Sequence, residues 1–440
     1  KNENFHGIAI DSRVVKKDNL FLTIKGKKNN GVKFISAAMK KGAKFVVSSS
    51  KIKKSKNKIL KVDDEITFLN TFAKMKRNNS KAKIFAITGS AGKTSLKNLL
   101  NDLFKNFGET LCSPKSYNNH YGVPLSLSHL NMKHQFGIFE VGMSKLGEIN
   151  KLSRMIKPHI GIITNIGEAH LENFKNKKGI AEAKSEIINN ISKGGTVILN
   201  RDDKFFYFLN KKARYKKLKV ISFGKNRKSD ISLISIKEKN GIKFTKVKVK
   251  NSIFDIQIKN IDVYNVLSSI AVIIELGLNL KKFLKIYKDI QIPEGRGKMY
   301  KIERYKKHFF LIDDSYNASP FSVKNAINRF SEIKKGKYKK YLLLGDMLEL
   351  GKNSEHYHIK LSKVINSSDI DKVFVKGEKT LFTFKNLKKN KQGNILQHNE
   401  DIDIILKNFI TNYDYLMIKG SNATGLNSIS KSMIKGTYVI

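Results

Sequence analysis

The stretch Thr88-Gly89-Ser90-Ala91-Gly92-Lys93-Thr94-Ser95 stands between an apolar segment, 84–88, and a helix-forming segment, 94–104. Its glycines let the backbone approach a phosphate closely, and the start of the following helix presents free N–H groups. Lys93 can then reach the β- and γ-phosphates of a nucleotide, and Thr94 can hold Mg²⁺. The loop is a short form, because Ile87 replaces the first glycine of the usual G-x-x-x-x-G-K-T spacing. This context favours a nucleotide-binding loop lined by residues 89–95 over a glycine turn beside a chance lysine.

Further buried strands follow this loop along the chain. Apolar stretches at 136–142, 160–167 and 195–200 alternate with helix-forming segments, and a strand-rich part runs from about 221 to 258. Buried strands that alternate with helices predict a parallel sheet covered on both faces. We therefore expect residues 81–293 to form a central ATP-binding domain with a mostly parallel sheet.

Two more domains are expected on either side of this one. Residues 1–80 alternate short apolar runs with glycine and polar turns, which is typical of a small α/β domain. After a turn-forming segment at 292–298, apolar strands ending in polar or glycine residues recur at 308–317, 340–351, 371–377 and 414–421. This pattern predicts a doubly wound, Rossmann-like domain over residues 294–440, and an α/β fold of three domains overall.

Candidate metal ligands follow two strands of the central domain. Glu140 ends one strand and His170 follows the next, so both are expected at the sheet edge that carries the phosphate loop. A carboxylate and an imidazole there can bind a second divalent ion, which assists phosphoryl transfer. Each also has an ordinary interpretation, as a turn residue or a structural histidine. Lys184, in the segment 179–187, is by its position only one lysine among many.

Polar strand ends recur in the third domain. Asp313-Asp314-Ser315-Tyr316-Asn317-Ala318 follows an apolar strand, where acidic and amide groups can meet a ribose or a metal-bound phosphate. Two later strands end in the same way, at 345–347 and 419–421. Asp and Asn after strands are often simple turn formers, but three such ends on one sheet indicate a site. Arg296, between two glycines of the linker, can touch a nucleotide only if the domains close.

The composition bounds the possible partners. The 440 residues carry a formal net charge of +48, which clustered on one surface would favour nucleic acid or an anionic membrane. Lysine instead recurs in nearly every segment, which indicates a compositional bias, and we expect no nucleic-acid partner. The single cysteine, Cys112, excludes an intramolecular disulfide and fits a reducing cytoplasm. The chain opens without an apolar signal core, and its longest apolar stretch, near 268–276, is too short to span a bilayer.

Taken together, these segments resemble the Mur ligase family. The resemblance runs from Asp11 to about Ser430 and rests on DSR (11–13), LFLTIKG (20–26), TGSAGKTS (88–95), YNNHYGVPLSL (117–127), FEVGMSKLGEI (139–149), NIGEAHLENF (165–174), GIAEAKSEI (179–187), GRG (295–297), DDSYNASP (313–320), LLGDMLELG (343–351) and IKGS (418–421). The motifs DDSYNASP and GDMLELG resemble those of the subgroup that joins D-alanyl-D-alanine to UDP-N-acetylmuramoyl-tripeptide. The nearest alternative is another ligase of the family, adding the third amino acid. A basic phosphate-loop NTPase acting on nucleic acid is a more distant one.

The resemblance implies a different binding role for each of the three domains. The N-terminal domain would hold the UDP group, the central domain would bind ATP, and the C-terminal domain would complete the site. ATP would phosphorylate the terminal carboxylate of the muramoyl tripeptide, and the amine of D-alanyl-D-alanine would attack the acyl phosphate. The resemblance thus implies ATP and Mg²⁺ as cofactors and a peptidoglycan precursor as substrate, and we expect a monomer.

Residue roles follow from the same resemblance, position by position. Lys93 would bind the ATP phosphates, while Thr94, Glu140 and His170 would serve Mg²⁺. Lys184 matches a family lysine that CO₂ carbamylates, and the carbamate would help to hold the second ion. The nucleotide would also contact Asn265, Arg296, Asp313, Tyr316 and Asn317. The substrate would contact Ser12, Arg13, Asn118 and Asn119.

Overall fold

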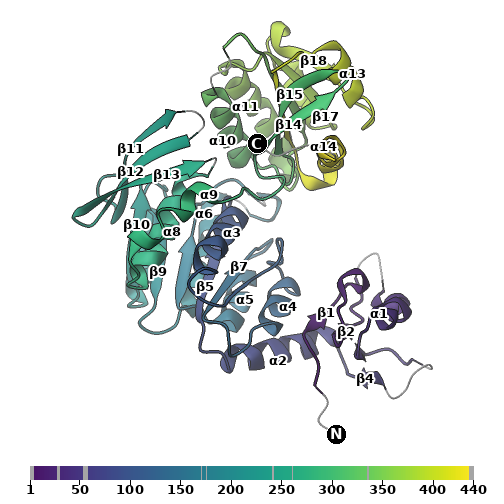
Figure 1. The fold of residues 1–440 in the computed structure, drawn as a ribbon, viewed down its shortest axis with the longest axis vertical. Coiled ribbons are helices and arrows are strands. Elements are labelled where there is room, and N and C mark those ends of the chain that lie inside the picture. The colour runs from purple at the N-terminus through teal and green to yellow at the C-terminus, as the bar shows by residue number, and fades with distance from the viewer. Residues whose placement is uncertain are drawn as a thin grey trace.

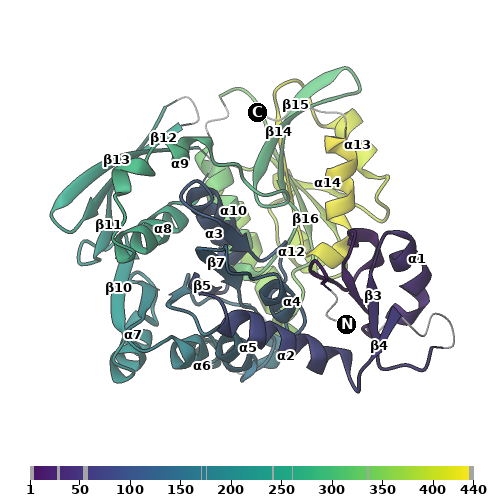
Figure 2. The same cartoon turned by 60° about the horizontal axis from the view of Figure 1, so that its bottom comes forward.

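The fold contains three sheets, each built from a separate stretch of the chain (Figure 1). The computed structural model describes residues 4–26, 30–52, 58–169, 171–174, 176–239, 242–259, 261–333 and 336–435. The N-terminal part (purple), the central part (blue to green) and the C-terminal part (green to yellow) form three lobes. In the turned view of Figure 2, the N-terminal lobe lies to one side, while the C-terminal lobe overlaps the central one.

The N-terminal lobe is a small parallel sheet covered on both faces. Its strands lie in the order β1 (Ile8–Ala9), β2 (Leu20–Leu22), β3 (Phe45–Ser48) and β4 (Ile59–Lys61). On one face, Ala38 of α1 (Ile35–Lys40) shares a core cluster with Phe21. On the other, Leu69 of α2 (Glu65–Asn78) shares a cluster with Leu22, and the Asp64 carboxylate caps the start of α2.

Helix α2 also ties this lobe to the central one. It packs against α4 (Gly122–Ser128), whose Leu125 belongs to the same core cluster as Leu69. Near the end of α2, the buried Arg77 guanidinium donates to the carbonyls of Ile156 and Lys157 at 2.6 and 2.7 Å. These carbonyls close a helix of the central lobe, so the two lobes share both apolar and polar contacts.

The central sheet is mostly parallel. Its strand order is β13-β12-β11-β10-β9-β8-β5-β7-β6. The parallel strands are β5 (Lys83–Thr88), β6 (Thr110–Cys112), β7 (Phe136–Glu140), β8 (Ile160–Ile163), β9 (Thr196–Asn200), β10 (Lys219–Gly224) and, paired with β10, β11 (Ile231–Lys239). β12 (Ile242–Val249) and β13 (Ser252–Lys259) continue the sheet in antiparallel fashion. Figure 1 shows this extension at the outer edge of the lobe.

Helices cover both faces of the parallel part. The face carrying Phe85 and Ile87 packs on α3 (Lys93–Phe104) and α8 (Val263–Glu275), with α9 (Ile286–Asp289) beside them. The face carrying Ile84 and Ala86 packs on α4, α5 (Glu148–Ile156), α6 (Lys177–Ser185) and α7 (Phe206–Tyr215). Alternate residues of β5 therefore face opposite layers, and all but the first, Lys83, are buried, as a central parallel strand requires.

The C-terminal lobe is doubly wound. Its strand order is β14 (Lys298–Arg304), β15 (Lys307–Asp314), β19 (Tyr415–Lys419), β16 (Lys340–Gly345), β17 (Lys372–Lys376) and β18 (Gln392–Ile395), with only the β14–β15 pair antiparallel. One face packs on α10 (Pro320–Glu332), α11 (Ser354–Asn366) and α12 (Thr380–Lys385). The other packs on α13 (Ile402–Asn408) and α14 (Leu426–Ile434).

These observations confirm the predicted fold class. The strands expected beside the phosphate loop and in the third lobe are present, and so is the expected mixture of strands and helices in the first. The edge strands β6, β14 and β18 were not predicted, because polar or basic residues interrupt their apolar pattern. The boundaries 1–80, 81–293 and 294–440 stay predictions. Within the described ranges, no helix has the length and apolar character needed to cross a membrane.

Candidate active site

The phosphate loop joins the central strand β5 to the start of α3, as the sequence predicts. Gly89 and Gly92 have φ angles of +150° and +83°, where side chains are strained. A Cβ on Gly89 would lie 1.9 Å from the Thr164 hydroxyl oxygen, so only glycine fits there. Helix α3 begins at Lys93, and its first turn directs backbone N–H groups toward the loop. The loop thus has the geometry of an anion cradle.

Residues that follow β8 hold this loop in shape, and sequence reasoning assigned them no role. The Thr164 hydroxyl donates to the Ala91 carbonyl at 2.6 Å. The Asn165 side chain brackets the same residue, accepting from the Ala91 N–H at 2.9 Å and donating to its carbonyl at 3.1 Å. The Ser90 hydroxyl donates to the Gly167 carbonyl at 2.9 Å. In the sequence, this role could have been inferred from the polar pair Thr164-Asn165 at the end of an apolar strand, which the structure places next to β5.

Thr94 and Glu140 meet beside the loop. The Thr94 hydroxyl donates to Glu140 Oε2 at 2.8 Å, and Asn118 Nδ2 donates to Oε1 at 2.7 Å. Only 1% of Glu140 is exposed. Because Glu140 pairs with Ile87 in the register of β7 on β5, its carboxylate reaches the same sheet edge as the loop. The expected proximity of Glu140 to the phosphate loop is therefore present.

Two lysines lie at the loop with perturbed electrostatics. The Lys93 ammonium donates to the Gly89 carbonyl at 2.6 Å. Burial lowers the pKa of Lys93, the charge of Arg296 acts in the same direction, and Glu140 opposes both. Lys184, on α6, is 2% exposed. Burial, reinforced by the charge of Lys93, holds the pKa of Lys184 well below its usual value. The charge of Lys93 thus acts on Lys184, and a shared site for the two lysines stays a prediction.

The structure describes only some of the residues predicted to bind metal. His170 lies outside the described residues, so its predicted position at the sheet edge stays a prediction. Among the residues the structure describes, no three His, Cys, Asp or Glu side chains gather as a metal cluster. Thr94 and Glu140 nevertheless supply two adjacent oxygen atoms beside the phosphate loop.

The linker before the C-terminal sheet reaches this cluster. The Arg296 guanidinium donates to the Thr94 hydroxyl at 3.2 Å and lies over the Tyr316 ring, 4.2 Å from its centre. The Tyr316 hydroxyl donates to Ser116 of the central lobe at 3.0 Å. Asp313 is turned toward the linker instead, accepting from the Gly295 N–H at 3.0 Å. The two lobes thus meet at the phosphate loop.

Two asparagines expected at the nucleotide lie nearby with different exposure. Asn265, in the first turn of α8, is buried, and its Oδ1 lies 3.2 Å from where a Cβ on Gly92 would stand. Asn317 is exposed, and its carbonyl accepts a hydrogen bond from the buried Lys419. Lys419 also lies 3.4 Å from the Asp314 carboxylate, so it anchors the loop after β15. Sequence reasoning noted the 419–421 strand end without assigning Lys419 this role.

The residues expected at the substrate occupy two places. Ser12 is buried at the start of a short 3-10 helix, while Arg13 is exposed and pairs with Asp11 at 2.7 Å. Asn118 holds Glu140, as described above, and Asn119 accepts from the Gly122 N–H at 2.9 Å, which caps the start of α4. The described contacts therefore bring Asn118 into the cluster around the phosphate loop, but not Asn119, Ser12 or Arg13.

Comparisons with known proteins agree with this architecture. Models of the Mur ligase family, catalytic domain, of the Mur ligase middle domain and of the Mur ligase, glutamate ligase domain match residues 4–77, 87–274 and 298–422. A UDP-N-acetylmuramoyl-tripeptide--D-alanyl-D-alanine ligase of Rickettsia prowazekii is 32% identical over 431 residues, covering 97% of this chain and 94% of the relative. The chain belongs to the Mur ligase family. The enzyme of the same name from Bacillus subtilis is 30% identical over 435 residues, with 98% and 93% covered.

Solved structures extend this agreement to the whole fold. MurF from Acinetobacter baumannii superimposes with a TM-score of 0.84 at 25% identity, over 97% of this chain and 93% of that one. MurF from Thermotoga maritima, solved in complex with ADP, has a TM-score of 0.81 at 25% identity, with 98% and 97% covered. The family resemblance inferred from the motifs is therefore confirmed. As a Mur ligase, the chain is an ATP-dependent amide-bond ligase of peptidoglycan precursor synthesis.

Proposed function

We propose that this Mur ligase joins D-alanyl-D-alanine to UDP-N-acetylmuramoyl-tripeptide, the reaction named for its relatives. The observation that carries the proposal is the convergence of Lys93, Thr94 and Glu140 on one sheet edge, with Arg296 reaching Thr94 from the linker. Such an arrangement suits the transfer of a phosphoryl group from ATP, because catalysis of that step is mainly alignment and charge neutralisation.

The residues present fit ATP and Mg²⁺. The positive-φ glycines and the start of α3 make a phosphate cradle, and the buried Glu140 carboxylate beside the Thr94 hydroxyl is an oxygen-rich pair of the kind Mg²⁺ takes. Mg²⁺ usually keeps only one or two protein ligands and fills its remaining positions with phosphate and water. When bound, it would neutralise negative charge on the phosphate oxygens. We propose Thr94 and Glu140 as holders of one Mg²⁺, and His170 with a carbamate on Lys184 as holders of a second ion.

The reaction then proceeds in two steps at this site. A carboxylate oxygen of the tripeptide bonds to the γ-phosphorus of ATP while the bond from that phosphorus to ADP breaks. The amine of D-alanyl-D-alanine, having lost a proton, bonds to the acyl carbon, and inorganic phosphate leaves. Lys93 holds the phosphate oxygens during the first step, and Arg296 offers a second positive charge to the same group.

The other roles divide among the three lobes. Ser12 and Arg13 are proposed for the UDP group, and Asn118 and Asn119 for the muramoyl substrate. Asn265 is proposed for the adenine, with Asp313, Tyr316 and Asn317 completing the nucleotide site from the C-terminal lobe. Because Asp313 already holds Gly295, its proposed contribution includes fixing the backbone that carries Arg296. We propose that the enzyme works as a monomer in the cytoplasm, where the lone Cys112 stays reduced.

A coupled assay of phosphate release tests the substrate assignment. The purified chain is supplied with Mg-ATP, UDP-N-acetylmuramoyl-tripeptide and D-alanyl-D-alanine, and each component is omitted in turn. Release that requires all three supports the proposal. Release with UDP-N-acetylmuramoyl-dipeptide and a diamino acid would assign the chain to the ligase that adds the third residue. Release that needs DNA or RNA and ignores the muramoyl peptide would refute a ligase role.

A further inference from the structure

Lys97 is a buried lysine one helical turn after Lys93. It faces the interior from α3, with only 1% of its surface exposed. Its ammonium donates to the backbone carbonyls of Ser113 and Lys115 at 2.6 and 2.5 Å. Burial lowers its pKa. A lysine is seldom buried this deeply without a specific role, because removing its charge from water is costly.

The two carbonyls belong to the loop that connects β6 to α4. The Ser116 hydroxyl of this loop lies 3.4 Å from the Thr94 hydroxyl and accepts from Tyr316 at 3.0 Å. Asn118, at the end of the loop, donates to Glu140. The loop therefore touches the phosphate-loop threonine, the candidate metal carboxylate and the C-terminal lobe within three residues.

The backbone of this loop is also under local constraint. Lys115 has a φ angle of +47°, a left-handed conformation that residues other than glycine rarely adopt. The bond from Lys97 to the Lys115 carbonyl lies at this residue. Ser113, the other anchored residue, is 1% exposed, so its carbonyl has little access to water. Loss of the Lys97 ammonium would leave a buried acceptor without this donor.

We propose that Lys97 is a positioning residue for the ligation reaction. By clamping two carbonyls at the base of the loop, it sets Ser116 and Asn118 against Thr94, Tyr316 and Glu140. Lys97 touches neither nucleotide nor substrate in this role. The inference rests on the proposed function, because the groups it positions are those assigned to ATP and Mg²⁺.

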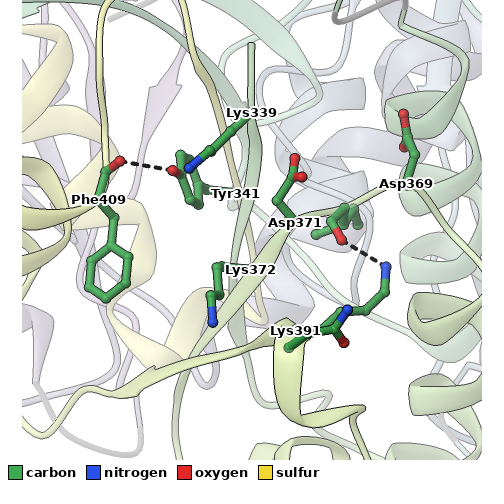
Figure 3. Close-up of a pocket in the computed structure, with 9 residues that line it drawn as sticks. Lys339, Tyr341, Asp369, Asp371, Lys372, Lys391 and Phe409 are labelled. Atoms are coloured by element: carbon green, nitrogen blue, oxygen red, sulfur yellow. Dashed lines mark hydrogen bonds between the residues drawn. The ribbon is translucent and has the colours of Figure 1, made fainter. Parts of the chain in front are cut away.

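A second buried lysine offers a matched control. Lys391, 8% exposed, donates to the carbonyls of Ser368 and Ile370, both at 2.7 Å. It lines a pocket with Lys372 and Asp371 at the amino ends of the C-terminal strands (Figure 3). The phosphate loop faces the carboxyl ends of the strands, so Lys391 makes the same kind of contact outside the active site.

The test compares Lys97→Met with Lys391→Met, since methionine fills a similar volume but cannot donate. Melting temperature, kcat, KM for ATP and the Mg²⁺ concentration for half-maximal rate are measured for each. We expect comparable losses of melting temperature, because both variants lose two bonds to carbonyls. We expect kcat to fall at least about 10-fold and the Mg²⁺ requirement to rise about 5-fold in Lys97→Met alone, as loss of buried hydrogen bonds predicts. Lys97→Arg should recover part of the lost kcat and should lower the Mg²⁺ requirement toward the wild-type value.

Equal kinetics in the two methionine variants would overturn the proposal and leave Lys97 a stabilising residue only. If Lys97→Met fails to fold, Lys97→Arg is compared with Lys391→Arg. A kinetic change confined to Lys97→Arg supports positioning, and the absence of any kinetic change overturns it. Titration of Mg-ATP by calorimetry gives a readout that does not need ligation. If the wild-type chain binds Mg-ATP but ligates none of the tested substrates, the substrate assignment fails. The effect of Lys97 is then judged from the Kd for Mg-ATP. An equal Kd in Lys97→Met and Lys391→Met overturns the positioning role.

Discussion

The Arg296 guanidinium donates to the Thr94 hydroxyl at 3.2 Å, although 202 residues separate the two in the sequence. Thr94 belongs to the phosphate loop and Arg296 to the linker before the C-terminal sheet. This hydrogen bond is one of the contacts that connect the lobe proposed to bind ATP with the lobe proposed to complete the site. Closure of such lobes around a nucleotide excludes water and brings the last catalytic groups into position.

Replacement of Lys93 tests the phosphate loop. In Lys93→Met, we expect ADP release that depends on the muramoyl peptide to fall at least about 1,000-fold, because a positive charge that neutralises the transferring phosphoryl group is removed. Lys105→Met, directly after the end of the same helix and paired with Asp102 at the surface, is the control and should keep normal turnover. Normal turnover in Lys93→Met would refute the assignment of this loop to ATP.

Lys184 is expected to act as a carbamate. Only a neutral amine reacts with CO₂, and the lowered pKa of Lys184 raises the neutral fraction near neutral pH. We expect Lys184→Ala to lose about 100-fold in kcat and to regain part of it with added acetate or another short carboxylate. Lys178→Ala, an exposed position on the same helix, should behave as wild type. Full activity of Lys184→Ala without any additive would remove the carbamate from the mechanism.

The hydrogen bond between Tyr316 and Ser116 links the two lobes and can be tested by a double-mutant cycle. Tyr316→Phe and Ser116→Ala each remove one partner of this bond. We expect each to raise the KM for ATP about 3- to 10-fold, and the double variant to be little worse than either single one. Effects that simply multiply in the double variant would mean that the bond is absent during turnover.

His159 predicts a pH dependence of stability. Its Nδ1 accepts from the Ile84 N–H at 2.9 Å, and burial with two nearby positive charges lowers its pKa to about 4. Because the unfolded value is near 6.5, the unfolded chain binds more protons between these pH values. Stability should therefore fall as pH drops from about 6.5 to about 4, by about 1 to 2 kcal/mol from this residue, because solvent screens a half-buried group.

Urea unfolding of wild type and His159→Asn at pH 7 and pH 5 measures this contribution. The wild type should lose more free energy of unfolding between the two pH values than the variant does. Equal losses would show that folding does not lower the pKa of His159.

Much of the fold could be predicted locally. The apolar strand 84–88, the glycine loop and the helix after it carry their own conformational signals, because strand burial, positive φ angles and helix starts depend on neighbouring residues. The repeated strand ends at 313–318, 345–347 and 419–421 likewise predicted the doubly wound lobe. Edge strands such as β18, whose sequence is QGNI, lack an apolar pattern and emerge only when a neighbouring strand offers backbone hydrogen bonds.

Local sequence patterns were enough to predict the phosphate loop, the strand ends that carry Glu140 and Asp313, and the family to which the chain belongs. Three contacts became known only from the packed fold: Lys97 holds the loop beside Thr94, Asn165 brackets Ala91, and Asp313 faces the linker. Each of these contacts joins residues from different segments of the chain. A lysine, an asparagine or an aspartate can bond to many carbonyls and N–H groups, and only the packed sheets determine which of these lie within 3 Å of it.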